Sequence, residues 1–162
     1  MKNAILEKGE HYYTHMSNVF NAIENEQLKY NWLITNCECY PQDRSIAELF
    51  SKEYLWISGK QLTEIICKEN FQFIWGVFSG FSSEVTLEDV LRYDLPFADG
   101  YEGFWKDNVG IQHPLAQVEL VAWDSSLTLL ISKDDSLIQK FRSNFPLSED
   151  LSELNARNNI KR

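Results

Sequence analysis

The segment from Phe71 to Phe81 constrains the fold more than any other part of this chain. It has the period of a β-strand, in which alternate residues lie on opposite faces. One face would carry Phe71, Phe73, Trp75, Val77, Ser79 and Phe81, and the other would carry Gln72, Ile74, Gly76, Phe78 and Gly80. Since both faces are partly apolar, we expect a central strand that is covered on both sides. The pair Ser79 and Gly80 leaves open a strand that bends or ends near Phe78.

Other segments supply the strands and helices that would surround it. Apolar and β-branched residues predict strands over residues 30–40 and 54–57, and a hairpin over 116–123 and 127–132. Helical spacing of apolar residues predicts helices over 11–25, 45–51 and 60–69. Thr86 and Asp134 resemble the N-caps of a short helix that ends near Pro96 and of a longer one that ends at Pro146.

The hairpin requires at least one antiparallel pair of strands. We therefore expect an α+β fold, with a mostly antiparallel or mixed sheet of about five strands and four to five helices packed on it. The chain of 162 residues is long enough for one core, so we assign residues 1–162 to a single domain. Residues 1–10 and 157–162 are mostly polar or basic, and we expect both ends to be flexible.

The charge balance limits the kinds of partner. The net charge is −9 at pH 7. Because nucleic acids and anionic membranes attract clustered Lys and Arg, we expect neither as a partner. No apolar run approaches the roughly 18 residues that a membrane span needs. A basic protein partner is favoured by charge complementarity, and the alternative is an acidic surface that serves solubility alone.

The cysteines indicate a reducing compartment. The first ten residues lack the apolar core of a secretory signal, and the three thiols, Cys37, Cys39 and Cys67, are odd in number. We therefore expect a cytoplasmic protein with free thiols. Cys37 and Cys39 would share one face of a strand, and a zinc site there would need Cys67 and a histidine as well. We interpret them as buried, inert thiols and expect no metal or cofactor.

Two motifs of ligand binding are incomplete. The run Ser58-Gly59-Lys60-Gln61 resembles the end of a phosphate-binding loop, but Tyr54 stands where that pattern needs glycine, and Gln61 replaces Ser or Thr. His11 and His15 have the i, i+4 spacing of a metal-binding pair. The glutamate of H-E-x-x-H is absent, because Tyr12 follows His11 directly.

Nucleophilic catalysis also lacks a complete set of residues. Ser79 lies between Gly76 and Gly80, which is the wrong spacing for G-x-S-x-G. His113, Asp124 and Ser125 are the residue types of a triad, but a strand of about eight residues, at roughly 3.3 Å each, separates His113 from the other two. We predict that His113 is structural and that the protein is not an enzyme.

The stretch from Glu84 to Asp107 stands out by its surface character. Its seven acidic residues are opposed only by Arg92 and Lys106, and its aromatic residues are Tyr93, Phe97, Tyr101, Phe104 and Trp105. Aromatic anchors among carboxylates suit a surface that binds a basic protein. The alternative is a loop that its aromatic residues fold over the core, with solvated carboxylates. The predicted partner-binding residues are Glu84, Glu88, Asp89, Asp94, Asp99, Tyr101, Glu102, Trp105 and Asp107.

Three segments carry a family resemblance: Tyr30-Asn31-Trp32-Leu33-Ile34, Gln72-Phe73-Ile74-Trp75-Gly76-Val77 and Glu119-Leu120-Val121-Ala122-Trp123-Asp124-Ser125-Ser126. With them, the chain after Lys29 resembles a small, poorly characterised family of bacterial cytosolic proteins. In size and acidity it also resembles the immunity proteins of bacterial polymorphic-toxin and contact-dependent inhibition systems. That resemblance implies a protein that binds one toxin domain, often a basic nuclease, and blocks it. Neither resemblance supplies active-site residues.

These observations support three hypotheses of different classes. The first is an immunity or inhibitor protein that neutralises a basic toxin domain through the acidic, aromatic stretch. The second is a small-molecule-binding domain or enzyme with an aromatic pocket formed by Trp75, Trp105, Trp123 and His113. The third is an acidic mimic of nucleic acid that inhibits a defence protein, which would require carboxylates spaced like phosphates.

Overall fold

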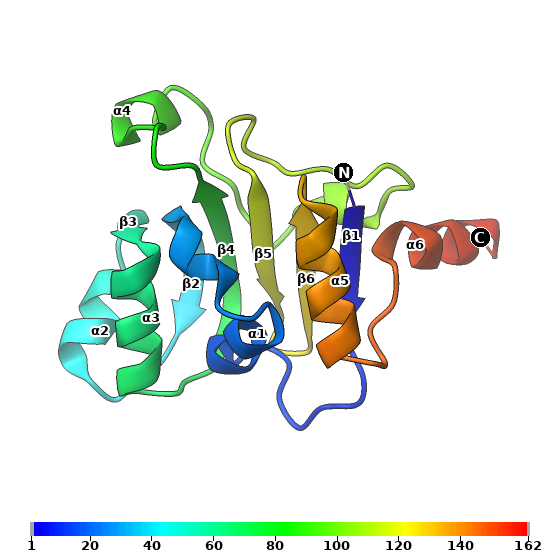
Figure 1. The fold of residues 1–162 in the computed structure, drawn as a ribbon, viewed down its shortest axis with the longest axis horizontal. Helices are drawn as coiled ribbons and strands as arrows, with labels where there is room; N and C mark the ends of the chain where they lie inside the picture. Colours follow the sequence, from blue (N-terminus) through cyan, green and yellow to red (C-terminus); the bar gives the residue numbers. More distant parts are fainter. Residues whose placement is uncertain (1, 162) are drawn as a thin grey trace.

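The computed structural model describes residues 2–161, and an antiparallel sheet of six strands lies at its centre (Figure 1). The strands lie in the order β1-β6-β5-β4-β2-β3. The predicted α+β class is confirmed, with six strands in place of about five. The strand bounds are β1 (Lys2–Leu6), β2 (Asn31–Cys39), β3 (Tyr54–Ser58), β4 (Phe73–Phe81), β5 (Val118–Trp123) and β6 (Leu127–Ser132).

Helices α1, α3 and α5 lie on one face of the sheet (Figure 1). The predicted helix over residues 11–25 is shorter than expected, because His15 has an extended backbone and occupies the N-cap position. None of the helices within residues 2–161 has the length and apolar character needed to cross a membrane. The helix bounds are α1 (Met16–Ala22), α2 (Arg44–Phe50), α3 (Gly59–Lys68), α4 (Leu87–Val90), α5 (Asp135–Asn144) and α6 (Leu151–Ile160), with 3₁₀ turns η1 (Glu26–Lys29) and η2 (Glu102–Trp105).

The prediction of a flexible N-terminal segment is wrong for β1. Residues 2–6 pair in antiparallel register with β6, and Ala4, Ile5 and Leu6 are buried. The outer edge of β1 is closed in turn, because Ile5 and Glu149 exchange main-chain hydrogen bonds of 2.9 and 3.0 Å. All these partners lie more than 100 residues away in sequence, so the local composition held no sign of the strand. Met1 lies outside the described residues.

The C-terminal segment is also more regular than predicted. Helix α6 begins after Asp150, whose side chain accepts a hydrogen bond from the Glu153 N–H, and it continues to Ile160. Asn155 holds it to the rest of the protein, since its Nδ2 donates to the Phe104 and Lys106 carbonyls at 2.8 and 2.9 Å. Residues 157–160, which we predicted to be flexible, thus continue this helix and are exposed, and Arg162 lies outside the described residues.

Strand β4 is central, as predicted, and it runs on to Phe81 without ending near Phe78. Its faces differ from the expected alternation at one point. Phe73 packs against Phe78 on the helical side, with ring centroids 5.0 Å apart, whereas an unbroken period of two would place them on opposite faces. Cys39 is opposite Phe73 and Glu38 is opposite Trp75, so Ile74 is an extra residue in a β-bulge. The bulge reverses the predicted face of Phe73.

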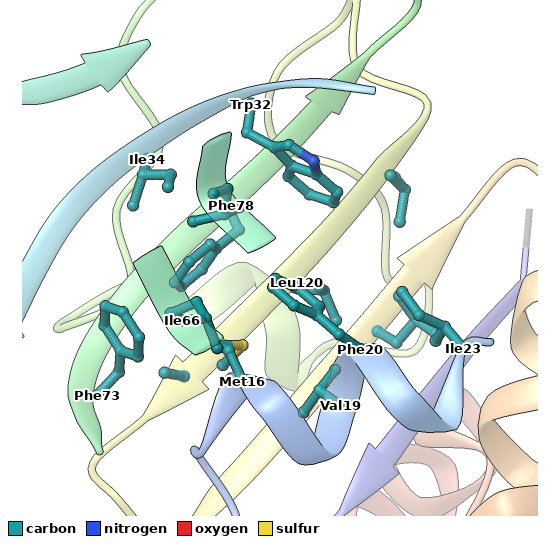
Figure 2. Packing of buried hydrophobic residues seen from close by; sticks show 14 of the residues in the cluster. Met16, Val19, Phe20, Ile23, Trp32, Ile34, Ile66, Phe73, Phe78 and Leu120 are labelled. Atoms are coloured by element: carbon teal, nitrogen blue, oxygen red, sulfur yellow. The ribbon is translucent and has the colours of Figure 1, made fainter. Parts of the chain in front are cut away.

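The helical face holds the larger core (Figure 2). In Figure 2, the side chains of α1 and of the turn after it point toward Trp32 of β2, Phe78 of β4 and Leu120 of β5, and Ile66 of α3 lies beside them. Trp32 is 1% exposed, and its indole N–H donates to the Gln27 carbonyl at 3.0 Å, so this large ring is buried without an unpaired donor. The opposite face of the sheet is covered mainly by irregular chain, and the candidate site lies there.

Candidate functional site

Residues 82–117 form a layer on the second face of the sheet, and we call them the loop layer. Apart from α4 and η2 this layer has no regular structure. Its buried residues pack on two apolar clusters of that face, one around Val77, Val121 and Ile131 and one around Leu33 and Phe81. The buried residues that the loop layer contributes to these clusters are Val90, Ala98, Phe104, Val109 and Ala116. The loop layer is therefore a structural cover for the second core.

The predicted partner-binding residues divide into two groups. Tyr101 packs on Phe104 and Trp105 packs on Trp123, with ring centroids 4.7 and 4.9 Å apart, and both residues are partly buried. The alternative interpretation, aromatic residues that fold the loop over the core, describes these two side chains. The acidic residues lie outward: Asp89 is partly exposed, and the exposed residues are Glu84, Glu88, Asp94, Asp99, Glu102 and Asp107.

Three large apolar side chains of the loop layer are exposed, and the predicted set did not include them. Leu91, Tyr93 and Phe97 are 41%, 43% and 44% exposed. Of these three residues, Tyr93 lines a surface hollow of about 300 Å³, together with Glu84, Val85, Asp89, Arg92 and Leu115. Tyr93 and Phe97 were visible as part of the aromatic pattern, but the pattern alone does not separate outward rings from buried ones. We call Leu91, Tyr93, Phe97 and the exposed carboxylates of residues 84–99 the acidic-aromatic surface.

Polar side chains hold the loop layer in place, because a buried irregular backbone needs partners for its N–H and C=O groups. Asn36 lies at a register shift of β2 with φ of 52°, and its Oδ1 accepts from the N–H groups of Ala98 and Asp99 at 2.8 and 3.1 Å. Gln112 brackets Phe97: its Oε1 accepts from the Phe97 N–H at 3.2 Å, and its Nε2 donates to the Phe97 carbonyl at 2.8 Å. These bonds fix the main chain that carries the exposed Phe97 ring.

His113 has a structural role of the kind predicted. Its Nδ1 accepts from the Leu115 N–H at 3.2 Å, so Nε2 carries the hydrogen and donates to the Val90 carbonyl at 2.9 Å. Burial lowers the pKa of the imidazole, which favours this neutral form. The ring packs against Phe81 and Tyr93.

The other two residue types of the triad lie elsewhere. Asp124 and Ser125 form the turn of the β5–β6 hairpin, at the end of β5 that is far from His113. Both have positive φ, 48° and 58°, as a type I′ turn requires. The structure therefore does not bring His113, Asp124 and Ser125 together.

The proposed aromatic pocket is only partly assembled. Trp75 and Trp105 both stack edge-on against Trp123, with centroid distances of 4.9 Å in each case. His113 belongs to the neighbouring cluster around Phe81 and does not stack on these three indoles. The three tryptophans thus form one group, and His113, the fourth residue of the proposed pocket, lies outside it.

The remaining sequence motifs have structural explanations. Ser58 and Gln61 form a capping box at the start of α3, in agreement with a strand-to-helix turn. His11 precedes α1, and His15 stacks on Tyr12 at 4.5 Å. Burial raises the pKa of the Cys39 thiol to about 11, so this thiol is protonated and unreactive at neutral pH. Within residues 2–161 no cluster of three or more His, Cys, Asp and Glu is arranged to hold a metal ion.

Glu119 is the site residue that the sequence analysis missed. It is the second residue of β5, on the face under the loop layer, and its exposed fraction is 0%. Its Oε2 accepts from the Gln112 N–H at 3.1 Å. Burial raises the pKa of this carboxyl to about 8, against a smaller lowering by the backbone N–H groups of Gln112 and His113. The sequence did contain one sign of this site, because Glu119 is the one charged residue in the otherwise apolar run Val118–Trp123.

Comparison with known proteins places the chain in a family without assigning an activity. The chain belongs to the family described as "Protein of unknown function (DUF2691)", whose model matches residues 5–156. Searches of the curated proteins and of the solved structures find no match.

Proposed function

We propose that this protein is a protein-binding module that engages a basic partner through the acidic-aromatic surface. The observation that carries the proposal is the exposure of Leu91, Tyr93 and Phe97 within seven residues of one another, where the Gln112 side chain forms two hydrogen bonds with the main chain of Phe97. Large apolar side chains on a fixed backbone lose little conformational entropy on binding, which is why such residues act as anchors.

The charges around these anchors favour a basic partner. Arg92 pairs with Glu88 and Asp89 at 3.6 and 3.8 Å, and both ion pairs are exposed and therefore weak. Asp94 and Asp99 flank Phe97 in sequence and are exposed. The net charge of −9 adds a long-range attraction for a cationic protein. The expected partner is thus a protein that presents Lys and Arg around an apolar recess.

Within this class, we propose an inhibitor that occludes a basic toxin domain, such as a nuclease. A nuclease has a cationic surface that receives phosphates, and an acidic protein with aromatic anchors can cover such a surface. The function would then reside in the complex, and the proposal assigns no chemical step to this chain.

The proposal is tested by binding and by protection. The candidate partner is the product of the gene next to the coding sequence, purified as an inactive variant, and its affinity is measured by calorimetry at low and high salt. We expect Tyr93→Ala and Phe97→Ala each to weaken binding by tenfold or more. Reversal of charge at Asp94 and Asp99 to Lys should slow association and reduce its salt dependence. Co-expression of the wild-type protein should protect cells from the active toxin.

A matched control lies on the opposite side of the sheet. Glu64 is an exposed carboxylate on α3, beside an apolar groove of about 420 Å³ between α3 and β3. Glu64→Lys changes the net charge as much as one reversal in the acidic-aromatic surface does. If Glu64→Lys weakens binding as strongly as Asp94→Lys, the interface is elsewhere. If no binding and no protection are found, the proposed function is wrong.

A further inference from the structure

The contacts around Glu119 connect the centre of the sheet to the acidic-aromatic surface. Its Oε2 accepts from the N–H group of Gln112. The side chain of Gln112 in turn accepts a hydrogen bond from the Phe97 N–H and donates one to the Phe97 carbonyl. The ring of Phe97 then packs edge-on against Tyr101, with centroids 5.3 Å apart. A change at the Glu119 carboxyl therefore acts, through Gln112, on the main chain of an exposed anchor.

Glu119 lies in a buried polar cluster whose hydrogen bonds are incomplete. Ser79 of β4 is directly opposite Glu119 of β5, so their Cβ atoms are about 5 Å apart. Thr35 of β2 lies on the same face, opposite Val77 and diagonal to Ser79. The Glu119 Oε1, Ser79 Oγ and Thr35 Oγ1 atoms are all buried without a hydrogen-bond partner among residues 2–161. Such a cluster tolerates a neutral carboxyl far better than a charged one, because no positive group compensates the charge.

The groups that face Glu119 come from the two neighbouring strands and from the loop layer. On β4 and β6 its cross-strand neighbours are Ser79 and Ile131, which carry no charge. From the loop layer, the facing titratable side chain is that of Tyr101, whose pKa is raised by burial and then by Glu119. Within the described part of the chain, no Lys or Arg affects the pKa of the Glu119 carboxyl, which burial dominates. The neutral form is thus favoured while the loop layer covers the cluster.

We propose that Glu119 is a positioning residue of the acidic-aromatic surface, whose protonated carboxyl holds the loop layer on the sheet and whose ionisation loosens it. Lifting of the loop layer gives the carboxylate access to water, where its affinity for the proton is that of an ordinary glutamate. Because the closed form binds the proton more tightly than the open form, loss of the proton favours opening. The effect on partner binding rests on the proposed function, whereas the effect on the loop layer does not.

The first test measures the loop layer without any partner. Hydrogen exchange is followed by NMR at the amide of Gln112 between pH 5 and pH 8, in the wild type and in Glu119→Gln. Glutamine keeps an oxygen that accepts the Gln112 N–H but cannot ionise. In the wild type, the protection factors should fall by up to tenfold per pH unit, since the opening is linked to one proton. In Glu119→Gln they should be independent of pH.

Internal controls keep this test decisive. The amide of Ile5 bonds to Glu149 at the far edge of the sheet, so it reports opening of the sheet and should be better protected than Gln112 at every pH. If Gln112 and Ile5 have the same free energy of opening at every pH, both exchange through global unfolding and the proposal is wrong. Equal pH dependence in the wild type and in Glu119→Gln also overturns it. Should Glu119→Gln fail to fold, the comparison of Gln112 with Ile5 in the wild type decides the same question.

The second test adds the partner. Affinity for the inactive toxin domain is measured at pH 6 and pH 8 for the wild type and for Glu119→Gln, with Glu64→Lys as a control of unchanged pH dependence. We expect the ratio of wild-type to Glu119→Gln affinity to fall at pH 8. A wild type that binds with no such change contradicts the coupling but leaves the proposed function intact. Absence of any binding contradicts the proposed function, while the exchange experiment still decides the role of Glu119 in the loop layer.

Discussion

Replacement of Asn36 by glycine measures how much one side chain that holds the loop layer contributes to stability. The Asn36 Oδ1 accepts from the Ala98 N–H at 2.8 Å and from the Asp99 N–H at 3.1 Å. Glycine removes this acceptor and adopts the φ of 52° at Asn36 without strain. The substitution therefore tests the two hydrogen bonds and leaves the backbone conformation of β2 accessible.

The expected cost follows from burial. Ala98 is fully buried, but its acceptor Asn36 is exposed and their hydrogen bond is partly buried, so loss of the acceptor should cost about 1–2 kcal/mol. Asp99 is exposed, so its N–H can bond to water and adds little. Glycine also increases the entropy of the unfolded chain, by roughly 0.5–1 kcal/mol. We therefore expect Asn36→Gly to lower the free energy of unfolding by about 1.5–3 kcal/mol.

Urea unfolding followed by tryptophan fluorescence measures this change, with Asn36→Asp as the matched control. Aspartate keeps an acceptor oxygen and tolerates positive φ, so it should lose less than about 1 kcal/mol. The reasoning is refuted if Asn36→Gly lies within about 0.5 kcal/mol of the wild type, or if Asn36→Asp costs as much as Asn36→Gly. An unchanged m-value shows that the two proteins expose the same surface on unfolding.

Three further predictions address other parts of the fold. The Glu119 carboxyl binds its proton more tightly in the folded protein, where its pKa is about 8, than as an ordinary glutamate, whose pKa is 4.5. The free energy of unfolding should therefore decline as the pH rises between these two values, by up to ~1.4 kcal/mol per pH unit. Urea titrations at pH 5, 6, 7 and 8 should show this decline in the wild type and not in Glu119→Gln. His113 should titrate below its ordinary pKa and carry its hydrogen on Nε2 at neutral pH, as ¹⁵N chemical shifts can establish; the opposite tautomer would contradict its bonds to Leu115 and Val90. Gly59→Ala should destabilise by about 3 kcal/mol or more in urea, because the added Cβ would collide with the rigid main chain around Gln27, and a neutral effect would contradict this packing.

The parts of the fold that were predictable have local signals. The central position of β4 follows from its two apolar faces, and the hairpin of β5 and β6 follows from its alternation and its turn. The caps at Thr86 and Asp134 are confirmed because each cap depends only on residues within one helical turn. These features need no knowledge of distant contacts, and the sequence contains all that determines them.

The features that were missed depend on contacts between distant segments. The strand β1 has its partners on β6 and at Glu149, so a short window of sequence around residues 2–6 cannot reveal it. The bulge at Ile74 arises from a mismatch between β4 and β2, and it reverses the face of Phe73. The anchoring by Asn36 joins residues more than 60 positions apart. Each of these required the sheet register, which periodicity within one strand does not define.

The stretch from Glu84 to Asp107 has features of both interpretations, a binding surface and a loop that covers the core. Along the loop layer, the aromatic residues divide by direction: Tyr101, Phe104 and Trp105 pack toward the sheet, while Tyr93 and Phe97 are more than 40% exposed. The inward rings fasten the layer to the core, which is the structural interpretation. Tyr93 and Phe97 also pack, on His113 and on Tyr101, but their exposed area contributes little to stability in the monomer.

The polar anchors explain how both groups coexist. A loop held only by aromatic packing could slide or rotate, and its outward rings would then have no defined position. Gln112 fixes the main chain of Phe97 from one side, and Asn36 fixes the adjoining Ala98 and Asp99 from another. Asn36 is exposed and Gln112 is partly buried, and the Gln112 N–H is held in turn by the buried carboxyl of Glu119, whose pKa is raised by burial. A cover for the core needs no such precision, whereas a binding surface does, because preorganised anchors lose less entropy when a partner arrives.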